Sequence, residues 1–433
     1  MEEPTKYLIE EIAAPIKNAL VGGPFGSNLV SSDYVSDGVP VIRGQNMGFG
    51  RWVTGTFAFV TREKSESLNA NIAKPGDIVF TQRGTLGQVA LVPETPFERY
   101  VISQSQMKLT VNENKADAMF IYYVFRTEEQ LRHILHSSIQ TGVPHTNLGI
   151  LRKTSVLLPA LKEQKAAAKI LSSLDDKIEL NQRMNATLEA IAQALFKAWF
   201  IDFEPVRANM ENRPSESASP EIAKFFPSEF ENDIPKGWEV KKLGEVLEAK
   251  GGTTPSTKNP TFWDGENYWA TPKDLSNLKF PVLLSTERKI TDEGVRQISS
   301  GILPKGTLLL SSRAPIGYLS ISQIPVSINQ GFIAIRPKEV SNLFMLYWLM
   351  QNMEAVKSRA NGSTFQEISK SSFREVEIIV ASSHILNLFE KKVQSLFERI
   401  VSNEKENTKL EKIRDSLLPR LISGKISVGR ETQ

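Results

Sequence analysis

Apolar residues recur every three or four positions in two long stretches of the chain. This alternating spacing is that of a coiled-coil seam. When Ile170 is aligned with Leu396, polar residues interrupt both seams at the same two steps. The seam positions are Ile170, Leu174, Lys177, Asn181, Met184, Leu188, Ile191, Leu195 and Ala198 in the first stretch, and Leu396, Ile400, Asn403, Asn407, Leu410, Arg414, Leu417 and Leu421 in the second.

The first stretch predicts an unusually long helix. Residues 162–200 contain neither glycine nor proline, and as a helix they would span roughly 58 Å at ~1.5 Å per residue. Polar residues inside a seam cost stability but penalise wrong registers, so the matching interruptions favour two helices that lie side by side, with Lys177 and Asn181 against Asn403 and Asn407. Two ordinary amphipathic helices, each packed on its own domain, remain the alternative.

Short β-type runs separated by glycine and proline lie outside these stretches. The clearest are 78–80, 89–92, 308–310 and 332–335. Pro159 precedes the first predicted helix and 202–205 ends it, whereas Ser382 and Ser383 can cap the second and Pro419 should end or kink it near Leu418. The proline- and serine-rich segment from Arg207 to Pro235 predicts an exposed linker.

The sequence also contains an internal duplication. Within 76–87 and 306–317, the residues Gly76, Arg83 and Gly87 match Gly306, Arg313 and Gly317 in order and in spacing. Smaller pairs in the same order are Gly22-Gly23 with Gly251-Gly252, 103–106 with 329–332, and 141–144 with 361–364. The distance between paired motifs changes slowly along the chain, as insertions and deletions in the loops of duplicated units would produce. We therefore expect two α+β domains and two long helices.

Composition adds limits rather than a function. The 433 residues are 40% hydrophobic, which is enough for two cores, and contain no apolar run that predicts a membrane span or a signal peptide. The absence of cysteine excludes disulfides and fits a reducing compartment. Residues 1–158 carry 15 basic and 15 acidic residues, and 234–380 carry 18 and 14. Any contact with DNA would therefore rest on a few placed residues or on a partner.

Signatures of catalysis are weak throughout. The four histidines have no metal-ligand spacing, and no phosphate-binding loop of the Walker type is present. The run 259–262, Asn-Pro-Thr-Phe, is one residue from the motif of DNA amino-methyltransferases, but no glycine-rich strand-turn-helix accompanies it. Asp77 near Gln82 and Arg83 faintly echoes a nuclease cluster without its second acid and lysine. We predict no catalytic residues and no metal site.

Several motifs resemble those of one family, the specificity subunits of type I restriction-modification systems. They are LLPALKEQ at 157–164, LDDKIELNQRMN at 174–185, ALFKAWFIDF at 194–203, PKGW at 235–238 and LLPRLISGKI at 417–426. The resemblance covers essentially the whole chain. It implies an α+β fold in which two duplicated target recognition domains, each mixed α/β with a strand-rich core, are joined by two long antiparallel coiled-coil helices with pseudo-twofold symmetry.

The resemblance also implies a function. Such a subunit is non-catalytic and reads a split, gapped site in double-stranded DNA, while its helices set the gap. Two methyltransferase subunits and the motor-nuclease subunits would join it and bring S-adenosylmethionine, ATP and Mg, none of which this chain would bind. The expected location is the prokaryotic cytoplasm, in association with the nucleoid and with no membrane.

The expected organisation follows from these boundaries. We predict the first target recognition domain at 1–158, a central spacer and partner-binding helix at 159–204, a linker at 205–234, the second target recognition domain at 235–381, a distal spacer and partner-binding helix at 382–424 and a tail at 425–433.

Loops rich in side chains that pair with base edges are the candidate DNA contacts. Arg83 and Arg313 are equivalent although two half-sites would differ, which favours phosphate binding or a structural role for them. Base reading is expected where the copies differ, at Arg43/Thr271, Gln45/Lys273 and His145/Phe365. The candidates are Arg43, Gln45, Asn46, Gln82, Arg83, Thr85, Thr141 and His145 in the first domain, and Thr271, Lys273, Ser311, Ser312, Arg313, Asn361, Ser363 and Thr364 in the second.

Two rival functions remain open at this point. A self-sufficient methyltransferase or nuclease would have to bind its cofactor as an isolated chain. A coiled-coil scaffold whose globular heads bind protein would show no sequence-selective DNA binding.

Overall fold

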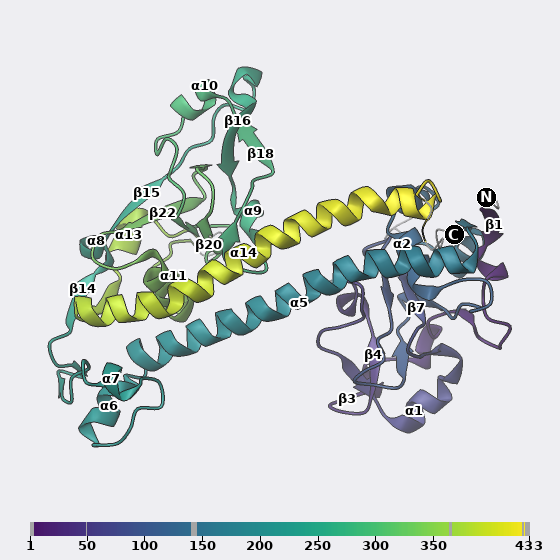
Figure 1. Ribbon diagram of the computed structural model, residues 1–433, viewed down its shortest axis with the longest axis horizontal. Coiled ribbons are helices and arrows are strands. Elements are labelled where there is room, and N and C mark those ends of the chain that lie inside the picture. Colours follow the sequence, from purple (N-terminus) through teal and green to yellow (C-terminus); the bar gives the residue numbers. More distant parts are fainter. Residues whose placement is uncertain (1–3, 49, 140–144, 363–365, 427, 429–433) are drawn as a thin grey trace, which may run out of the picture. The chain divides into compact units, whose positions relative to one another are not determined.

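The computed structural model describes residues 4–48, 50–139, 145–362, 366–426 and 428. The chain divides into two compact units (Figure 1), unit 1 with residues 1–178 and 408–433 and unit 2 with residues 179–407. Two helices of 40 residues, α5 (Leu161–Phe200) and α14 (Ser383–Ile422), contribute residues to both units. Among the described residues, no helix has the length and apolar character needed to cross a membrane.

Unit 1 is built on two sheets whose strands are almost wholly buried. The first is antiparallel, and the second contains one parallel pair, β4 with β9. The first sheet has the order β2 (Leu20–Gly22), β10 (Gln106–Leu109), β7 (Ile78–Thr81), β8 (Val89–Leu91), and the second β3 (Tyr34–Val35), β5 (Ala58–Val60), β4 (Val39–Ile42), β9 (Tyr100–Ile102), β6 (Ile72–Ala73). Strands β1 (Thr5–Leu8) and β11 (Ser155–Leu158) pair separately, and the helices are α1 (Arg62–Ser67), α2 (Ala118–Phe125), α3 (Glu128–His136) and α4 (Leu148–Lys153).

Unit 2 repeats this plan with additions. Its first sheet has the order β15 (Leu247–Gly251), β22 (Phe332–Pro337), β19 (Leu308–Ser311), β20 (Leu319–Ser322), β17 (Val282–Leu283), and its second β18 (Arg288–Ile290), β16 (Trp263–Ala270), β21 (Ser327–Ile328). The pairs β12 (Phe230–Glu231) with β13 (Ile234–Pro235) and β14 (Glu239–Lys242) with β23 (Glu377–Val380) stand apart. The helices are α6 (Glu204–Met210), α7 (Pro220–Ala223), α8 (Leu243–Val246), α9 (Pro272–Ser276), α10 (Asp292–Arg296), α11 (Asn342–Gln351), α12 (Met353–Lys357) and α13 (Lys370–Arg374).

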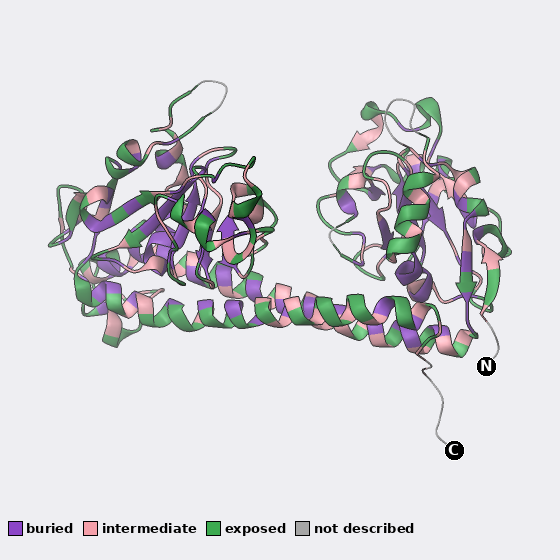
Figure 2. Ribbon diagram, turned by 90° about the horizontal axis from the view of Figure 1, so that it is seen from above, coloured by how far each residue is buried: buried purple, intermediate pink, exposed green. Residues whose placement is uncertain are grey.

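Strand register shows that the two units are copies. Ile78 pairs with Leu91 in unit 1, and their matches in the duplicated sequence, Leu308 and Ile321, pair in unit 2. The four runs predicted as strands from the sequence lie in β7, β8, β19 and β22. Figure 2 shows these strands buried at the centre of each unit, and buried and exposed residues alternating along both long helices.

In unit 2 the two long helices are antiparallel and are joined by buried amide pairs. The Nδ2 of Asn181 donates to Oδ1 of Asn407 at 2.9 Å, and the Nδ2 of Asn403 donates to Oδ1 of Asn185 at 2.7 Å. None of the four residues is more than 4% exposed. Counted from the first residue of each helix, Asn181 and Asn403 hold the same position, as do Asn185 and Asn407. A local pseudo-twofold axis therefore relates the two bonds.

The predicted contact between Asn181 and Asn407 is confirmed, but the geometry corrects which positions of the two helices are equivalent. The predicted alignment matched Lys177 with Asn403 and Asn181 with Asn407, whereas the structure makes Asn181 equivalent to Asn403 and Asn185 equivalent to Asn407. The two alignments differ by about one helical turn. Both therefore place apolar residues on the same face, and periodicity alone does not separate them.

The buried stripe of α5 also lies one residue beyond the predicted seam. The predicted position Ile191 is 49% exposed, while Ile170, Leu174, Lys177, Met184, Leu188, Leu195 and Ala198 are only half-buried. In α14, Ile400, Asn403 and Asn407 are buried, and Leu396, Leu410 and Leu417 are half-buried. The stripe shifts because α5 packs on the sheets and short helices of each unit as well as on α14, so its apolar face is wider than a two-helix seam. The residues of this stripe are Leu171, Asp175, Ile178, Asn185, Ala192, Phe196 and Trp199.

Unit 1 uses a charged contact between the same helices. The Asp175 carboxylate accepts a hydrogen bond from the Tyr123 hydroxyl at 2.6 Å and forms an ion pair with Arg414 at 2.7 Å. Burial raises the pKa of Tyr123, as does the neighbouring Asp175 charge, so the hydroxyl stays protonated and donates. The Asp175 carboxylate, the Tyr123 hydroxyl and the Arg414 guanidinium thus meet one another's hydrogen-bonding and charge requirements.

The segment expected to be an exposed linker is instead folded against unit 2. Val206 and Phe226 are at most 4% exposed and belong to its core, and Ala208 is also fully buried. The Glu204 carboxylate organises the loop by accepting bonds from the hydroxyls of Ser215 and Ser217 at 2.5 and 2.7 Å. Burial by itself would raise the pKa of Glu204, but these bonds, the Glu216 amide and Arg213 lower it to about 2. Polar composition predicted exposure because the apolar residues are spaced without a helical or strand period.

Pro419 does not end the second helix, which continues to Ile422. Its ring removes one backbone hydrogen bond. Leu418 and Leu421 are 7% and 3% exposed and pack in the core of unit 1, which keeps the last turn helical.

The amide pairs predict a measurable coupling. Asn185→Ala and Asn403→Ala should each lower the free energy of unfolding by about 1–3 kcal/mol, because each leaves a buried amide without its partner. The double variant should lose less than the sum, by at least ~0.5 kcal/mol. Urea denaturation followed by helical circular dichroism measures this, with the exposed Thr187→Ala as control. Strictly additive losses would show that the pair is not coupled.

Candidate nucleic-acid interface

The candidate residues of unit 1 gather around a single turn, 103–106, which leads into β10 at Gln106. The backbone N–H of Ser103 donates to Ile42 at 3.0 Å, beside the loop that begins at Arg43. The N–H of Gln82 donates to Ser105 at 2.7 Å, and that of Thr146 donates to Gln82 at 3.0 Å. Loops that follow β4 and β7 and the segment that begins at His145 therefore meet at one place.

Unit 2 builds the same junction around its equivalent turn, 329–332. Asn329 donates to Ala270 at 3.1 Å, Ser312 donates to Gly331 at 2.8 Å and Ile368 donates to Ser312 at 3.0 Å. These bonds join the loop before α9, the loop after β19 and the segment near Glu367. The backbone of the junction is thus built in the same way in both copies.

The second glycine of each glycine pair packs closely on the backbone of its junction. A Cβ added to Gly23 would lie 1.9 Å from the backbone oxygen of Ser103, and one added to Gly252 would lie 1.8 Å from that of Ile328. Since no side chain fits at this distance, close backbone approach explains the second glycine of each pair.

Several candidates serve the structure rather than a ligand. Asn46 is fully buried, where its amide bridges the Arg43 N–H and the carbonyls of Thr54 and Thr56. Ser311 is also fully buried and its hydroxyl binds the turn at 315–318, while Ser312 is 3% exposed. The Thr271 N–H and hydroxyl both donate to Asp274, which fixes the start of α9.

The other candidates remain accessible. Arg83, Thr85, Gln45, Lys273 and Asn361 are exposed, and Gln82, Arg43, His145 and Arg313 are half-buried. The Gln45 amide donates to the Thr56 carbonyl at 2.9 Å, and Lys273 forms a surface ion pair with Glu287 at 2.8 Å. Thr141, Ser363, Thr364 and Phe365 lie outside the described residues.

The two arginines occupy equivalent positions but have different neighbours. Arg83 forms an isolated β-bridge with His145, and Arg313 forms one with Glu367. His145 therefore corresponds to Glu367, two residues beyond the position expected from the sequence. The Arg313 guanidinium lies 3.5 Å from the Glu367 carboxylate, so its charge is partly neutralised.

One aromatic residue at the junction escaped the sequence analysis. Phe25 is 89% exposed on the loop that follows Gly22-Gly23. The Gln104 amide holds this loop, donating to the carbonyls of Gly26 and Leu29 at 2.6 and 3.2 Å. In unit 2 the equivalent Gln330 accepts a hydrogen bond from the Thr254 hydroxyl at 2.5 Å. The sequence did contain a signal for this residue, because Phe25 is an aromatic residue that lies between Gly23 and Gly26.

The two catalytic lookalikes have structural roles. The Asn259 side chain accepts the Thr261 N–H at 3.1 Å and caps a turn. Asp77 is 3% exposed and forms a buried ion pair with Lys108 at 3.1 Å. In the described part of the chain, no group of three or more acidic or histidine side chains could hold a metal ion.

Comparison with known proteins identifies the class. The model of the type I restriction modification DNA specificity domain matches residues 30–190 and 235–413, one match for each copy. The chain therefore belongs to this family, whose members are DNA-specificity subunits rather than enzymes in their own right. The fold class expected from the sequence is confirmed.

Particular relatives cover most of the chain. The type I restriction enzyme HindI specificity subunit of Haemophilus influenzae is 30% identical over 402 residues, covering 82% of this chain and 87% of the relative. The MjaIX specificity subunit of Methanocaldococcus jannaschii is 43% identical over 374 residues, covering 85% and 82%. The S subunit structure from M. genitalium has the same fold, with a TM-score of 0.58 at 18% identity over 96% of this chain and 95% of that chain.

Proposed function

We propose that this chain is the sequence-reading subunit of a type I restriction-modification complex and that it recognises a split, gapped site in double-stranded DNA. Unit 1 would read one half-site and unit 2 the other. The supporting observation is the duplicated junction, in which the same backbone hydrogen bonds hold loops with different exposed side chains. A constant scaffold with variable polar loops is what recognition of two different half-sites requires.

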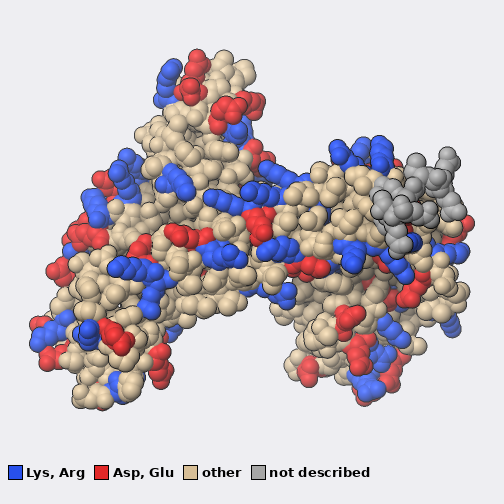
Figure 3. All heavy atoms as spheres, viewed as in Figure 1, with Lys and Arg blue, Asp and Glu red and all other residues tan. Residues whose placement is uncertain are grey.

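The division of roles among the loop residues follows from their contacts. Gln45, Thr85, Lys273 and Asn361 differ between the copies or are exposed, which suits them to base edges. Arg83 and Arg313 hold equivalent positions, which suits contact with phosphate. On the face shown in Figure 3, basic and acidic side chains are interspersed. Together with the near balance of charge in each half of the sequence, this favours a few placed phosphate contacts.

The partners and cofactors follow from the same proposal. Two methyltransferase subunits would bind around the long helices, and motor-nuclease subunits would complete the complex in the cytoplasm near the nucleoid. S-adenosylmethionine, ATP and Mg would bind to those partners. The long helices, with residues 159–204 and 382–424, would act as the spacer between the recognition domains at 1–158 and 235–381. The segments 205–234 and 425–433 would connect or follow them.

Methylome sequencing tests the proposed function. A host that expresses the chain with its methyltransferase partner should carry a gapped adenine-methylation motif that disappears when only this chain is deleted. The control restores the chain on a plasmid and should restore the motif. Retention of every motif in the deletion strain would reject the proposal.

Helix length should set the gap. Insertion of one heptad after Ile178 in α5 and another after Asn407 in α14 leaves the contacts inside each unit intact. Each inserted heptad lengthens its helix by about 10.5 Å, and the gap should grow by about three base pairs of ~3.4 Å each. Both half-sites should stay the same in methylome sequencing. The control is an insertion of equal length after Glu113, in an exposed turn, and a gap that stays constant in the helix variant would sink the spacer role.

Arg83 should contribute more to salt-dependent binding than Arg313. Arg83→Ala should weaken binding to all sequences and reduce the slope of log Kd against log salt by about one. Arg313→Ala should change the slope less, because Glu367 already neutralises part of its charge. Fluorescence anisotropy with duplexes of different sequence measures both. A changed base preference without a changed slope would contradict the phosphate role.

A further inference from the structure

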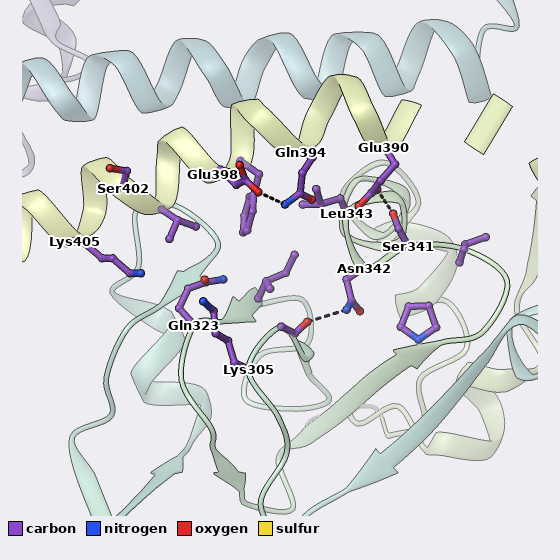
Figure 4. Close-up of a pocket in the computed structure, with 16 residues that line it drawn as sticks. Lys305, Gln323, Ser341, Asn342, Leu343, Glu390, Gln394, Glu398, Ser402 and Lys405 are labelled. Atoms are coloured by element: carbon purple, nitrogen blue, oxygen red, sulfur yellow. Dashed lines mark hydrogen bonds between the residues drawn. The ribbon is translucent and has the colours of Figure 1, made fainter. Parts of the chain in front are cut away.

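Unit 2 contains a groove of about 810 Å³ between α14 and the edge of its first sheet (Figure 4). Its floor is apolar and includes Ile321, Phe397 and Val401. Gln394 and Glu398 lie along its helical wall, where the Gln394 amide donates to the Glu398 carboxylate at 2.7 Å. The groove belongs to neither of the two junctions described above.

The duplication shows which part of unit 1 corresponds to this groove. Ile321 is equivalent to Leu91 by strand register. Counted from the first residue of each long helix, Gln394 is equivalent to Ser172 and Glu398 to Asp176. The same three positions therefore exist in both units.

In unit 1 the space is filled by the chain itself. Arg51 is only 4% exposed, and its guanidinium forms an ion pair with Asp176 and lies 3.5 Å from the carbonyl of Ser172. It also stacks 4.8 Å from the centre of the Trp52 ring. The backbone of Arg51 is fixed because its carbonyl accepts the Leu91 N–H at 2.9 Å.

Unit 2 has no counterpart of the Arg51 and Trp52 side chains at the equivalent positions. The Ile321 N–H donates to Pro281 at 2.9 Å, as the Leu91 N–H does to Arg51. Pro281 thus stands at the position of Arg51, and Val282 at that of Trp52. Both side chains are much smaller than those they replace, and neither carries a charge. Glu398 keeps the carboxylate that Asp176 supplies in unit 1, but the arginine that binds this carboxylate in unit 1 has no counterpart at Pro281.

We propose that this groove receives an arginine beside an aromatic ring from the methyltransferase subunit. The incoming guanidinium binds Glu398 and the ring packs on the apolar floor, as Arg51 and Trp52 do within unit 1. Lys305 and Lys405 line the same groove and favour an acidic residue next to the pair. The inference rests on the proposed function, since it assigns the partner to that complex. It makes the two halves of the chain unequal in how they bind their partners.

The experiment measures the Kd between the full chain and the purified methyltransferase subunit of the same system. Glu398→Lys should raise the Kd at least tenfold, because it places a like charge against the arginine. Glu113→Lys, at an exposed acid in a turn of unit 1 outside both long helices and the groove, should leave the Kd unchanged. Gln323→Trp, which fills the groove without a charge change, should weaken binding as Glu398→Lys does. Thermal melting checks that each variant is folded.

A photo-crosslinker at Gln394 gives the second readout. Mass spectrometry should find it joined to a methyltransferase peptide in which an arginine adjoins an aromatic residue. An unchanged Kd for Glu398→Lys, or a crosslinked peptide without such a pair, overturns the inference while methylation of a gapped motif would still uphold the proposed function. If the unaltered chain does not bind the methyltransferase at all, both the partner assignment and this inference are rejected.

Discussion

The register of the two long helices depends on hydrogen bonds between buried amides. Asn181 with Asn407 and Asn185 with Asn403 are almost completely removed from water. A slip of one turn would leave their donors and acceptors unsatisfied, each at about 1–3 kcal/mol. Leucine at these positions would bury more apolar surface but would accept several registers. Because both helices also carry residues of each core, the amide pairs fix which residues those cores receive.

Comparison of the two duplicated units distinguishes the residues that build the fold from the loop residues that can differ for DNA recognition. The junction is built from backbone hydrogen bonds and from the close-packed Gly23 and Gly252, which impose no side chain on the exposed loops. Where side chains do support it, they are buried, as with Asn46 and Ser311. The exposed positions are thereby free to differ, and a change such as Gln45 to Lys273 leaves the scaffold intact. This separation explains how one architecture can serve two half-sites.

The sequence was sufficient for the larger features and insufficient for the register. Periodicity located both helices, and spacing located the duplicated strands, because both signals extend over many residues. The alignment of the helices was wrong by one turn, since a seam that is shifted by a turn presents the same face. Folding of 204–235 depends on bonds to Glu204 from residues up to 13 positions away, which no local pattern reveals. Among the loop candidates, burial alone distinguished Asn46 from its neighbour Gln45, and burial is a property of the tertiary structure.

The same duplication shows where symmetry has been lost. A symmetric pair of units would bind two identical partners through identical surfaces. The exchange of Arg51-Trp52 for Pro281-Val282 changes one of these surfaces while the strand hydrogen bonds on either side persist. In unit 1 the arginine neutralises Asp176 internally, so that wall is satisfied before any partner arrives. In unit 2 the equivalent Glu398 is bonded to Gln394, a neutral neighbour on its own helix, and can exchange this bond for a stronger, charge-assisted one. The two units therefore offer different surfaces, just as the two halves of the proposed DNA site would differ in sequence.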